Sequence, residues 1–140
     1  MSLLAQAIRT SVPEGPLGYP PVRVNIQGAD GVGKSTFAAK SDDVIFLQSE
    51  DGLKYIEAPR LPVAMTWQDL LDQVKALAND PHEYKTLCLD TTDAASILAE
   101  RHVCEKEGWE SIETPGFGKG QVKVKEAWVR ILDGLQVCHD

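Results

Sequence analysis

The sequence predicts an α/β fold with a mainly parallel sheet flanked by helices. Short apolar runs of strand length alternate with longer segments whose apolar residues recur at helical spacing. Because parallel strands need a crossover between them, this alternation favours strand–helix–strand units over hairpins. The chain has 140 residues, of which 43% are hydrophobic, and this is enough for one domain with one core.

Residues 1–21 are expected to precede the domain proper, which occupies residues 22–140. Residues 2–9 have the composition of a short helix, and residues 11–21 are rich in proline and glycine, which stops that helix. The N-terminus lacks the pattern of a signal peptide, and no run in the sequence reaches the ~18 apolar residues of a membrane span. We therefore expect no membrane partner and a cytoplasmic location.

The first half of the domain contains four predicted elements. Residues 22–27 alternate apolar and polar side chains with β-branched residues, which is typical of a strand. A helix over about residues 34–40 and a second strand over residues 44–48 follow. Thr66 then opens a capping-box pattern, [ST]-x-x-[DE], before an amphipathic helix that ends at residues 79–81.

The second half repeats this alternation. An apolar run over residues 86–90 ends in a carboxylate, and a helix is expected from about Asp93 to its end at Gly108. A glycine-rich loop over residues 114–120 precedes a last amphipathic helix. The apolar face of that helix contains Val124, Ala127, Trp128, Ile131, Leu132 and Leu135.

The segment GADGVGKST matches the phosphate-loop pattern G-x-x-x-x-G-K-[ST] at every fixed position. Its glycines allow backbone N–H groups to approach a phosphate chain, and it lies between a predicted strand and a predicted helix. Lys34 is expected to reach the β- and γ-phosphates, Ser35 to bind Mg²⁺ and Thr36 to lie near the α-phosphate. The predicted contacts to ATP are Gly28, Ala29, Asp30, Gly31, Val32, Gly33, Lys34, Ser35 and Thr36.

Two carboxylates end apolar runs after this loop. A phosphate-loop protein needs an acid near the loop to support Mg²⁺, and Asp90 ends the run TLCLD. Its alternative role is to cap the next helix, although Thr91 and Thr92 are also suitable caps. Glu50 follows the other run and is placed to polarise a water that attacks the γ-phosphate. A simple polar turn over residues 50–52 is the alternative interpretation.

The charge of the chain limits how it can contact nucleic acid. It has 14 Lys and Arg residues against 21 Asp and Glu residues, a formal net charge of −7. This excludes a protein that coats nucleic acid through bulk positive charge, so any contact must be local. Phe117, Lys119 and Lys123 are the candidate contacts to single-stranded DNA, with the lysines on phosphates and the ring on a base. A solvated helix face beside an ordinary glycine loop is the alternative.

The order of these motifs resembles the RecA-like ATPases. The similarity is closer to the phage-encoded RecA-like nucleotide-binding proteins that are associated with single-strand annealing and recombination. It covers roughly residues 22–138, and its pieces are Gly28–Thr36, Glu50-Asp51-Gly52, Leu87–Asp90 and the GFGKG sequence of Gly116–Gly120. The resemblance implies that Glu50 activates water and that Asp90 supports Mg²⁺. The insertion of Asp51 between Glu50 and the glycine departs from the pattern.

The resemblance also implies a central strand after the last predicted helix, for which there is no room before Asp140. We therefore expect the domain to be incomplete at its C-terminus or to be completed by a partner. His139 follows a helix and is expected to be an ordinary tail residue. A homo-oligomer that supplies an arginine in trans is a further expectation.

The predicted function is Mg²⁺-dependent ATP binding and hydrolysis, with Lys34 and Glu50 as catalytic residues, in phage or prophage DNA recombination or single-strand annealing. Two alternatives stay open. A phosphate-loop kinase generally needs lid arginines, and the chain has only Arg101 and Arg130 after its third predicted strand. A nucleotide-binding module without hydrolysis is the other. A GTPase is disfavoured because no N-K-x-D sequence occurs.

Overall fold

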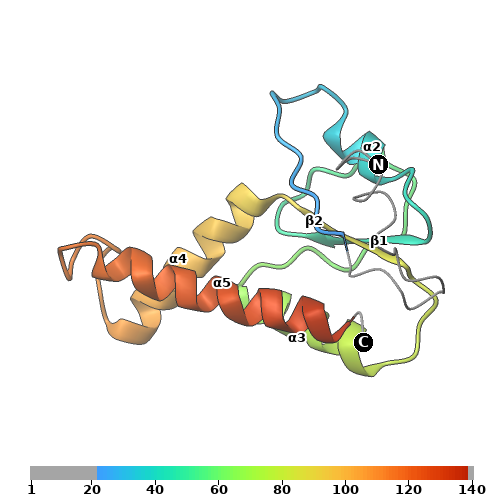
Figure 1. Ribbon diagram of the computed structural model, residues 1–140. Coiled ribbons are helices and arrows are strands. Elements are labelled where there is room, and N and C mark those ends of the chain that lie inside the picture. Colours follow the sequence, from blue (N-terminus) through green and yellow to red (C-terminus); the bar gives the residue numbers. More distant parts are fainter. Residues whose placement is uncertain (1–21, 139–140) are drawn as a thin grey trace, which may run out of the picture.

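A computed structural model describes residues 22–138. The predicted N-terminal helix and lead-in, and His139, lie outside the described residues. The elements in chain order are α2 (Lys34–Ala38), β1 (Val44–Gln48), α3 (Trp67–Asn79), β2 (Thr86–Asp90), α4 (Thr92–Glu107) and α5 (Lys119–Val137). Figure 1 shows α2 on one side of a small sheet and the three longer helices on the other, with α4 and α5 extending away as an arm.

The sheet consists of β1 and β2, which run parallel as the alternation predicted. Val44 lies opposite Thr86 and Gln48 lies opposite Asp90. The helix α3 belongs to the crossover between the two strands. The predicted bounds of both strands are confirmed. Because the register pairs their last residues, both strands end at the same edge of the sheet.

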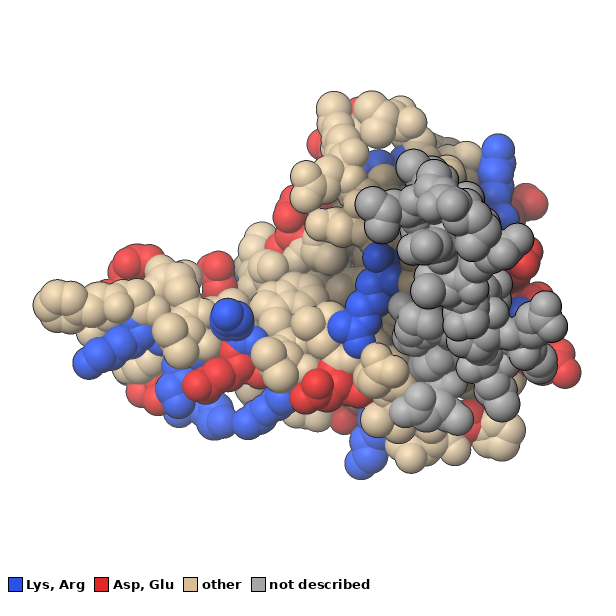
Figure 2. Space-filling model, viewed as in Figure 1, with Lys and Arg blue, Asp and Glu red and all other residues tan. Residues whose placement is uncertain are grey.

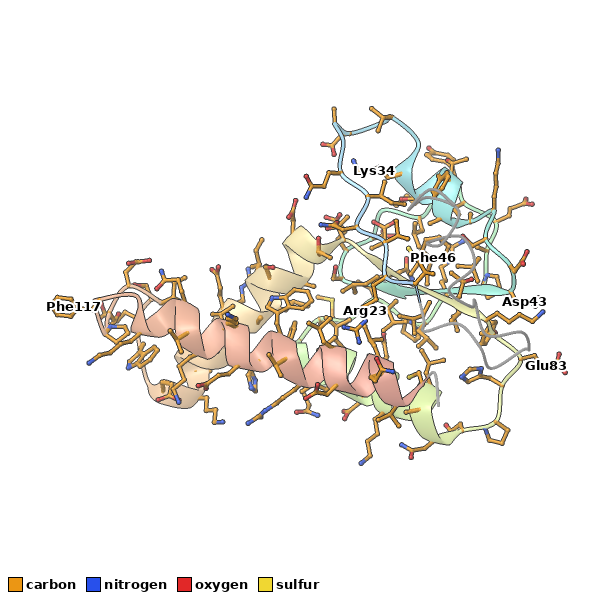
Figure 3. The ribbon with its side chains drawn as sticks, viewed as in Figure 1. Arg23, Lys34, Asp43, Phe46, Glu83 and Phe117 are labelled. Atoms are coloured by element: carbon orange, nitrogen blue, oxygen red, sulfur yellow. The ribbon has the colours of Figure 1, made fainter. Side chains whose placement is uncertain are left out.

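The strand β1 is buried along its whole length because helices or loops cover both of its faces. Successive side chains of a strand point to opposite faces. Ile45 and Leu47 pack in the main core with α3, α4 and α5, whereas Val44 and Phe46 pack in a second core with α2 and the loop residue Leu53. Phe46, labelled in Figure 3, is fully buried. This two-sided burial explains the uninterrupted apolar sequence of the strand.

The outer edge of β1 is covered by the loop that leads to α3. The Phe46 amide donates to the Pro59 carbonyl at 2.9 Å, and the Leu61 amide donates to the Phe46 carbonyl at 2.9 Å. The Ala64 amide donates to the Gln48 carbonyl at 2.8 Å. Within residues 22–138, β1 thus has hydrogen-bonded neighbours on both edges and β2 has a strand neighbour on one.

The predicted strand over residues 22–27 is wrong for the described structure. Val22 is 84% exposed and Val24 is 69% exposed, and the segment belongs to no ladder. A strand needs partners for its backbone groups and a face to bury. No strand among the described residues pairs with this segment. In this segment, the Arg23 guanidinium donates a hydrogen bond to the Gln136 side chain of α5 at 2.9 Å.

The helix α3 begins with the predicted capping box. The Thr66 hydroxyl accepts from the Asp69 amide at 3.1 Å, and the Asp69 carboxylate accepts from the Thr66 amide at 2.8 Å and from the Met65 amide at 2.9 Å. The backbone hydrogen bonds from Thr66 and Met65 lower the pKa of Asp69 below its ordinary value. The helix contacts α5 through Trp67 and Trp128, whose rings meet edge to face with centroids 5.2 Å apart.

The two helices of the arm, α4 and α5, occupy nearly the residues that the sequence predicts. The helix α4 ends at Glu107 and is capped by Gly108, whose φ of 70° suits a glycine C-cap, as predicted. It begins at Thr92, with Thr91 as its cap. The predicted face of α5 is buried at Ala127 and Ile131, whereas Leu132 is exposed. None of the helices within residues 22–138 is long and apolar enough to cross a membrane.

Candidate nucleotide site

The phosphate loop forms a turn that leads into α2 and contains three glycines. Gly31 has a φ of 78° and Gly33 a φ of 97°, which other residues rarely adopt. A Cβ atom at Gly28 would lie 2.9 Å from the Val32 side chain. Gly31 is not a fixed position of the motif, so the motif alone does not show that the backbone needs it. The predicted helix 34–40 ends early, at Ala38.

The side chain of Lys34 lies against this loop. Its ammonium donates to the Gly28 carbonyl at 2.7 Å and to the Ala29 carbonyl at 2.9 Å, and the Asp30 carboxylate lies 4.0 Å away. Figure 3 shows Lys34 beside α2, above the sheet. Phosphate oxygens are stronger acceptors than carbonyls, because the hydrogen bonds become charge-assisted on both sides. A bound phosphate chain can therefore replace the two carbonyls as the partner of this ammonium.

Ser35 and Asp90 are in direct contact although they are 55 residues apart in the chain. The Ser35 hydroxyl donates to the Asp90 carboxylate at 2.5 Å. Asp90 is the last residue of β2, so the contact joins the phosphate loop to the carboxyl end of the sheet. The cap of α4 is Thr91, whose hydroxyl accepts from the Ala94 amide at 3.2 Å. Asp90 is therefore not needed as a cap, and its carboxylate faces the loop.

The backbone around Asp90 is fixed by Ser49, a residue for which no role is predicted from the sequence. The Ser49 amide donates to the Asp90 carbonyl at 3.0 Å, and its hydroxyl donates to the Thr91 carbonyl at 2.6 Å. Ser49 is buried and follows the last residue of β1. These two bonds extend the contact between the strands beyond the ladder and hold Asp90 in place. A serine directly after a buried strand was the available signal.

Glu50 lies at the same edge of the sheet but outside these contacts. It comes two residues after Gln48, which pairs with Asp90 in the register. Its side chain is exposed, and its backbone carbonyl accepts a hydrogen bond from the Gly52 amide at 3.0 Å. The neighbouring Asp51 pairs with Lys54 at 3.5 Å. The structure places Glu50 near the end of β2 without a hydrogen bond to the phosphate loop.

The three candidate DNA contacts lie together at the end of the arm. Phe117 is fully exposed, and Lys119 is the first residue of α5. The Lys123 ammonium lies 3.7 Å from carboxylates of both Glu107 and Glu126. Figure 3 shows Phe117 at the far end of the arm, away from Lys34. Positive and negative side chains are mixed along the visible face of the arm in Figure 2. These residues are therefore separate from the phosphate loop.

The oxygen atoms at the loop suit a hard cation. Among the residues that the structure describes, no group of three or more His, Cys, Asp or Glu side chains lies close enough to hold a metal ion. Ser35 and Asp90 nevertheless present a hydroxyl and a carboxylate beside the phosphate loop. Mg²⁺ often takes one or two protein oxygens and receives its other ligands from phosphates and water. The donor set at Ser35 and Asp90 fits that arrangement.

The loop and its contact with the end of β2 are features of a P-loop nucleotide-binding protein. A family model described as AAA domain matches residues 20–140. The chain therefore belongs to the AAA domain family of P-loop ATPases.

The chain is also similar to a prophage protein. It is 27% identical over 114 residues to the SPbeta prophage-derived uncharacterized protein YorG of Bacillus subtilis (strain 168). The match covers 77% of this chain and 35% of that protein, so the chain spans about a third of the length of this relative. No solved structure matches the chain.

Proposed function

We propose that this chain binds ATP with Mg²⁺ and hydrolyses it. The observation that carries the proposal is the hydrogen bond from Ser35 to Asp90, which joins the phosphate loop to the carboxyl end of a parallel strand. Ligands of open α/β sheets bind at that edge. Membership of the AAA domain family supports nucleotide binding independently of this contact.

Each residue has a role that follows from its position. The backbone of residues 28–33 and the Lys34 ammonium hold the phosphates, and Ser35 and Asp90 hold the metal. Bound Mg²⁺ supplies positive charge that offsets the charge developing on the phosphates. Glu50 accepts a proton from the water that attacks the γ-phosphorus, and the bond to ADP breaks. Glu50 must approach the loop for this step, since its side chain is exposed and has no hydrogen bond to the loop.

We further propose a RecA-like sheet. Two features support it. β2 has a strand neighbour on one edge only within residues 22–138. Residues 22–27 lead into the phosphate loop, are exposed, and pair with no strand among the described residues. One more parallel strand between β2 and residues 22–27 would satisfy the backbone groups of both segments.

The biological role that we propose is DNA recombination or single-strand annealing in a phage or prophage, in the cytoplasm of the host. The similarity to a prophage-derived protein supports the phage origin. Phe117, Lys119 and Lys123 are the proposed contacts to single-stranded DNA, because an exposed ring beside lysines suits base stacking and phosphate binding. A homo-oligomer would supply an arginine in trans to the nucleotide, and hydrolysis would then change how the protomers hold DNA.

The test is ATP turnover with and without single-stranded DNA, in the wild type and in Glu50→Gln. The amide has nearly the same size as the carboxylate but is not a base, so ATP should still bind while turnover falls about 100-fold or more. Asp51→Asn is the matched control, because Asp51 is the adjacent acid and pairs with Lys54 at 3.5 Å. Its turnover should stay within about twofold of the wild type.

Three results would replace the proposal. Equal turnover in Glu50→Gln would show that Glu50 is not the base. Binding without turnover would favour a nucleotide-dependent interaction module, an alternative that the exposed position of Glu50 also favours. Transfer of phosphate to an added acceptor would favour a kinase.

A further inference from the structure

Two aromatic side chains are exposed on the two segments that pack together in the second core, α2 and the loop after β1. Phe37 of α2 is 65% exposed, and Tyr55, in the loop between β1 and α3, is 98% exposed. Residues close to them in the sequence are anchored, since Ala38 and Leu53 are buried in the second core. An exposed aromatic ring has a free face on which the base of a nucleotide can stack.

The loop that carries Tyr55 is packed against the helix that carries Phe37. Leu53 and Ala38 belong to one apolar cluster, and Ile56 packs against the same cluster. The Arg60 guanidinium binds the Leu53 carbonyl at 2.5 Å and the Ile56 carbonyl at 2.9 Å. Tyr55 therefore lies between two residues whose backbone is held. This arrangement holds the backbone at Tyr55 within the loop that packs against α2.

The expected direction of the bound phosphate chain also points to Phe37 and the loop of Tyr55. If the nucleotide binds as proposed above, Lys34 contacts the β- and γ-phosphates and Thr36 lies near the α-phosphate. The ribose and the base must then continue beyond Thr36. Phe37 is the next residue of α2, and the loop of Tyr55 packs on the residue after it.

We propose that Phe37 and Tyr55 form the base end of the nucleotide site and hold a purine by stacking. This inference rests on the proposed nucleotide binding and adds the group that recognises the base. Stacking uses the face of the ring system, which adenine and guanine share, rather than the edge atoms that distinguish them. The two aromatic rings therefore contribute equally to ATP and GTP binding.

The experiment compares three ligands, ATP, GTP and inorganic tripolyphosphate, by titration calorimetry with Phe37→Ala and Tyr55→Ala. Each variant should bind ATP and GTP between about fivefold and a hundredfold more weakly, by the same factor for both nucleotides. Affinity for tripolyphosphate, which has no base, should not change. Tyr55→Phe should bind like the wild type because it keeps the stacking face.

Tyr84→Ala is the matched control. Tyr84 is a partly exposed tyrosine in the loop before β2, where its ring packs against His82 with centroids 5.6 Å apart. It lies near the amino end of β2, at the edge of the sheet away from Asp90. This substitution should leave the affinities for all three ligands unchanged.

The outcomes separate this inference from the proposed function. Unchanged nucleotide affinity in both alanine variants would overturn the stacking site. An equal loss for ATP and tripolyphosphate would also overturn it, because the substitutions would then act on the phosphate loop. A wild type that binds tripolyphosphate but not nucleotides would overturn the proposed ATP binding together with the stacking site, and only the phosphate loop would remain as a phosphate site. A wild type that binds none of the three ligands would overturn the proposed function and the stacking site with it.

Discussion

The two regions to which we assign chemistry, the phosphate-loop edge of the sheet and the tip of the arm, are built in different ways. At the sheet edge, Ser35 and Asp90 are 55 residues apart and meet at 2.5 Å. Their contact depends on the register of β1 and β2 and on two cores. At the tip, Phe117, Lys119 and Lys123 are neighbours in the sequence, and one loop and the start of α5 place them. The first region therefore depends on the whole fold, whereas the second depends on local structure.

Among the variants that test this difference, Gly120→Ala, in the first turn of α5 beside the tip, should change the free energy of unfolding most. A Cβ atom there would lie 1.8 Å from the Ile112 carbonyl oxygen, so the backbone has to move. We expect a loss of about 2–3 kcal/mol in the free energy of unfolding, measured by urea denaturation. ATP affinity of the folded protein should stay as in the wild type.

Gly134→Ala, in the same helix, is the control for that substitution. Its Cβ atom would lie 2.7 Å from a methyl group of Val74, which is a side chain and can rotate away. Alanine also favours the helix by about 1 kcal/mol relative to glycine, and this offsets part of the clash. If the two variants are equally stable, the close backbone contact at Gly120 does not hold the tip together.

A smaller effect is expected from the double variant Lys119→Ala and Lys123→Ala. Single-stranded DNA should bind about tenfold more weakly, and the slope of log affinity against log salt should fall by about 1.4, or 0.7 for each lost phosphate contact. Fluorescence anisotropy with a labelled oligothymidylate measures both quantities. ATP affinity should not change, because the tip is separate from the phosphate loop.

The control for the DNA experiment is Lys54→Ala, which removes a lysine near the sheet edge that pairs with Asp51. It should leave DNA affinity and its salt dependence as in the wild type. An unchanged slope in the double variant would show that the arm does not contact DNA phosphates. Only the phosphate-loop edge of the sheet would then keep an assigned function.

The smallest effect concerns the cap of α3, which supports both regions. Thr66→Ala should lower the free energy of unfolding by about 1 kcal/mol, because the Asp69 amide loses its acceptor. The lowered pKa of Asp69 means that its ionised form is stabilised by folding. Its contribution is present above the pKa of an unfolded aspartate and is lost as the pH falls through the lower folded value.

The matching measurement is the stability of Asp69→Asn against that of the wild type, from about pH 7 down to about pH 2. The two proteins should differ at neutral pH and converge at the acid end. A difference that does not vary with pH would show that the Asp69 charge has no part in the cap.

The features predicted correctly from the sequence are those that short patterns determine. The bounds of β1 and β2 follow from continuous apolar runs, and the capping box of α3 follows from Thr66 and Asp69. The alternation over residues 22–27 is equally regular, yet no strand forms, because pairing depends on a neighbour that a local pattern cannot reveal.

The parts of the site that the sequence did not reveal depend on contacts across the fold. Ser49 holds Asp90 only because the two strands end in register, and its place directly after a buried strand is the one local sign of that role. In the sequence, Tyr55 is an ordinary loop residue. Its proposed role depends on the packing of Leu53 and Ile56 with Ala38 of α2. Such roles depend on three-dimensional neighbours rather than on residue type.

The central claim is that Ser35 and Asp90 form the metal end of one nucleotide site, and ATP titrations with Mg²⁺ and with EDTA test it most directly. The wild type should bind ATP more tightly with Mg²⁺, and Lys34→Ala should bind weakly in both conditions. Asp90→Asn should match the wild type in EDTA and lose most of the gain from Mg²⁺. Glu83→Gln, which alters an exposed acid before β2, should keep that gain. A full Mg²⁺ effect in Asp90→Asn would contradict the claim.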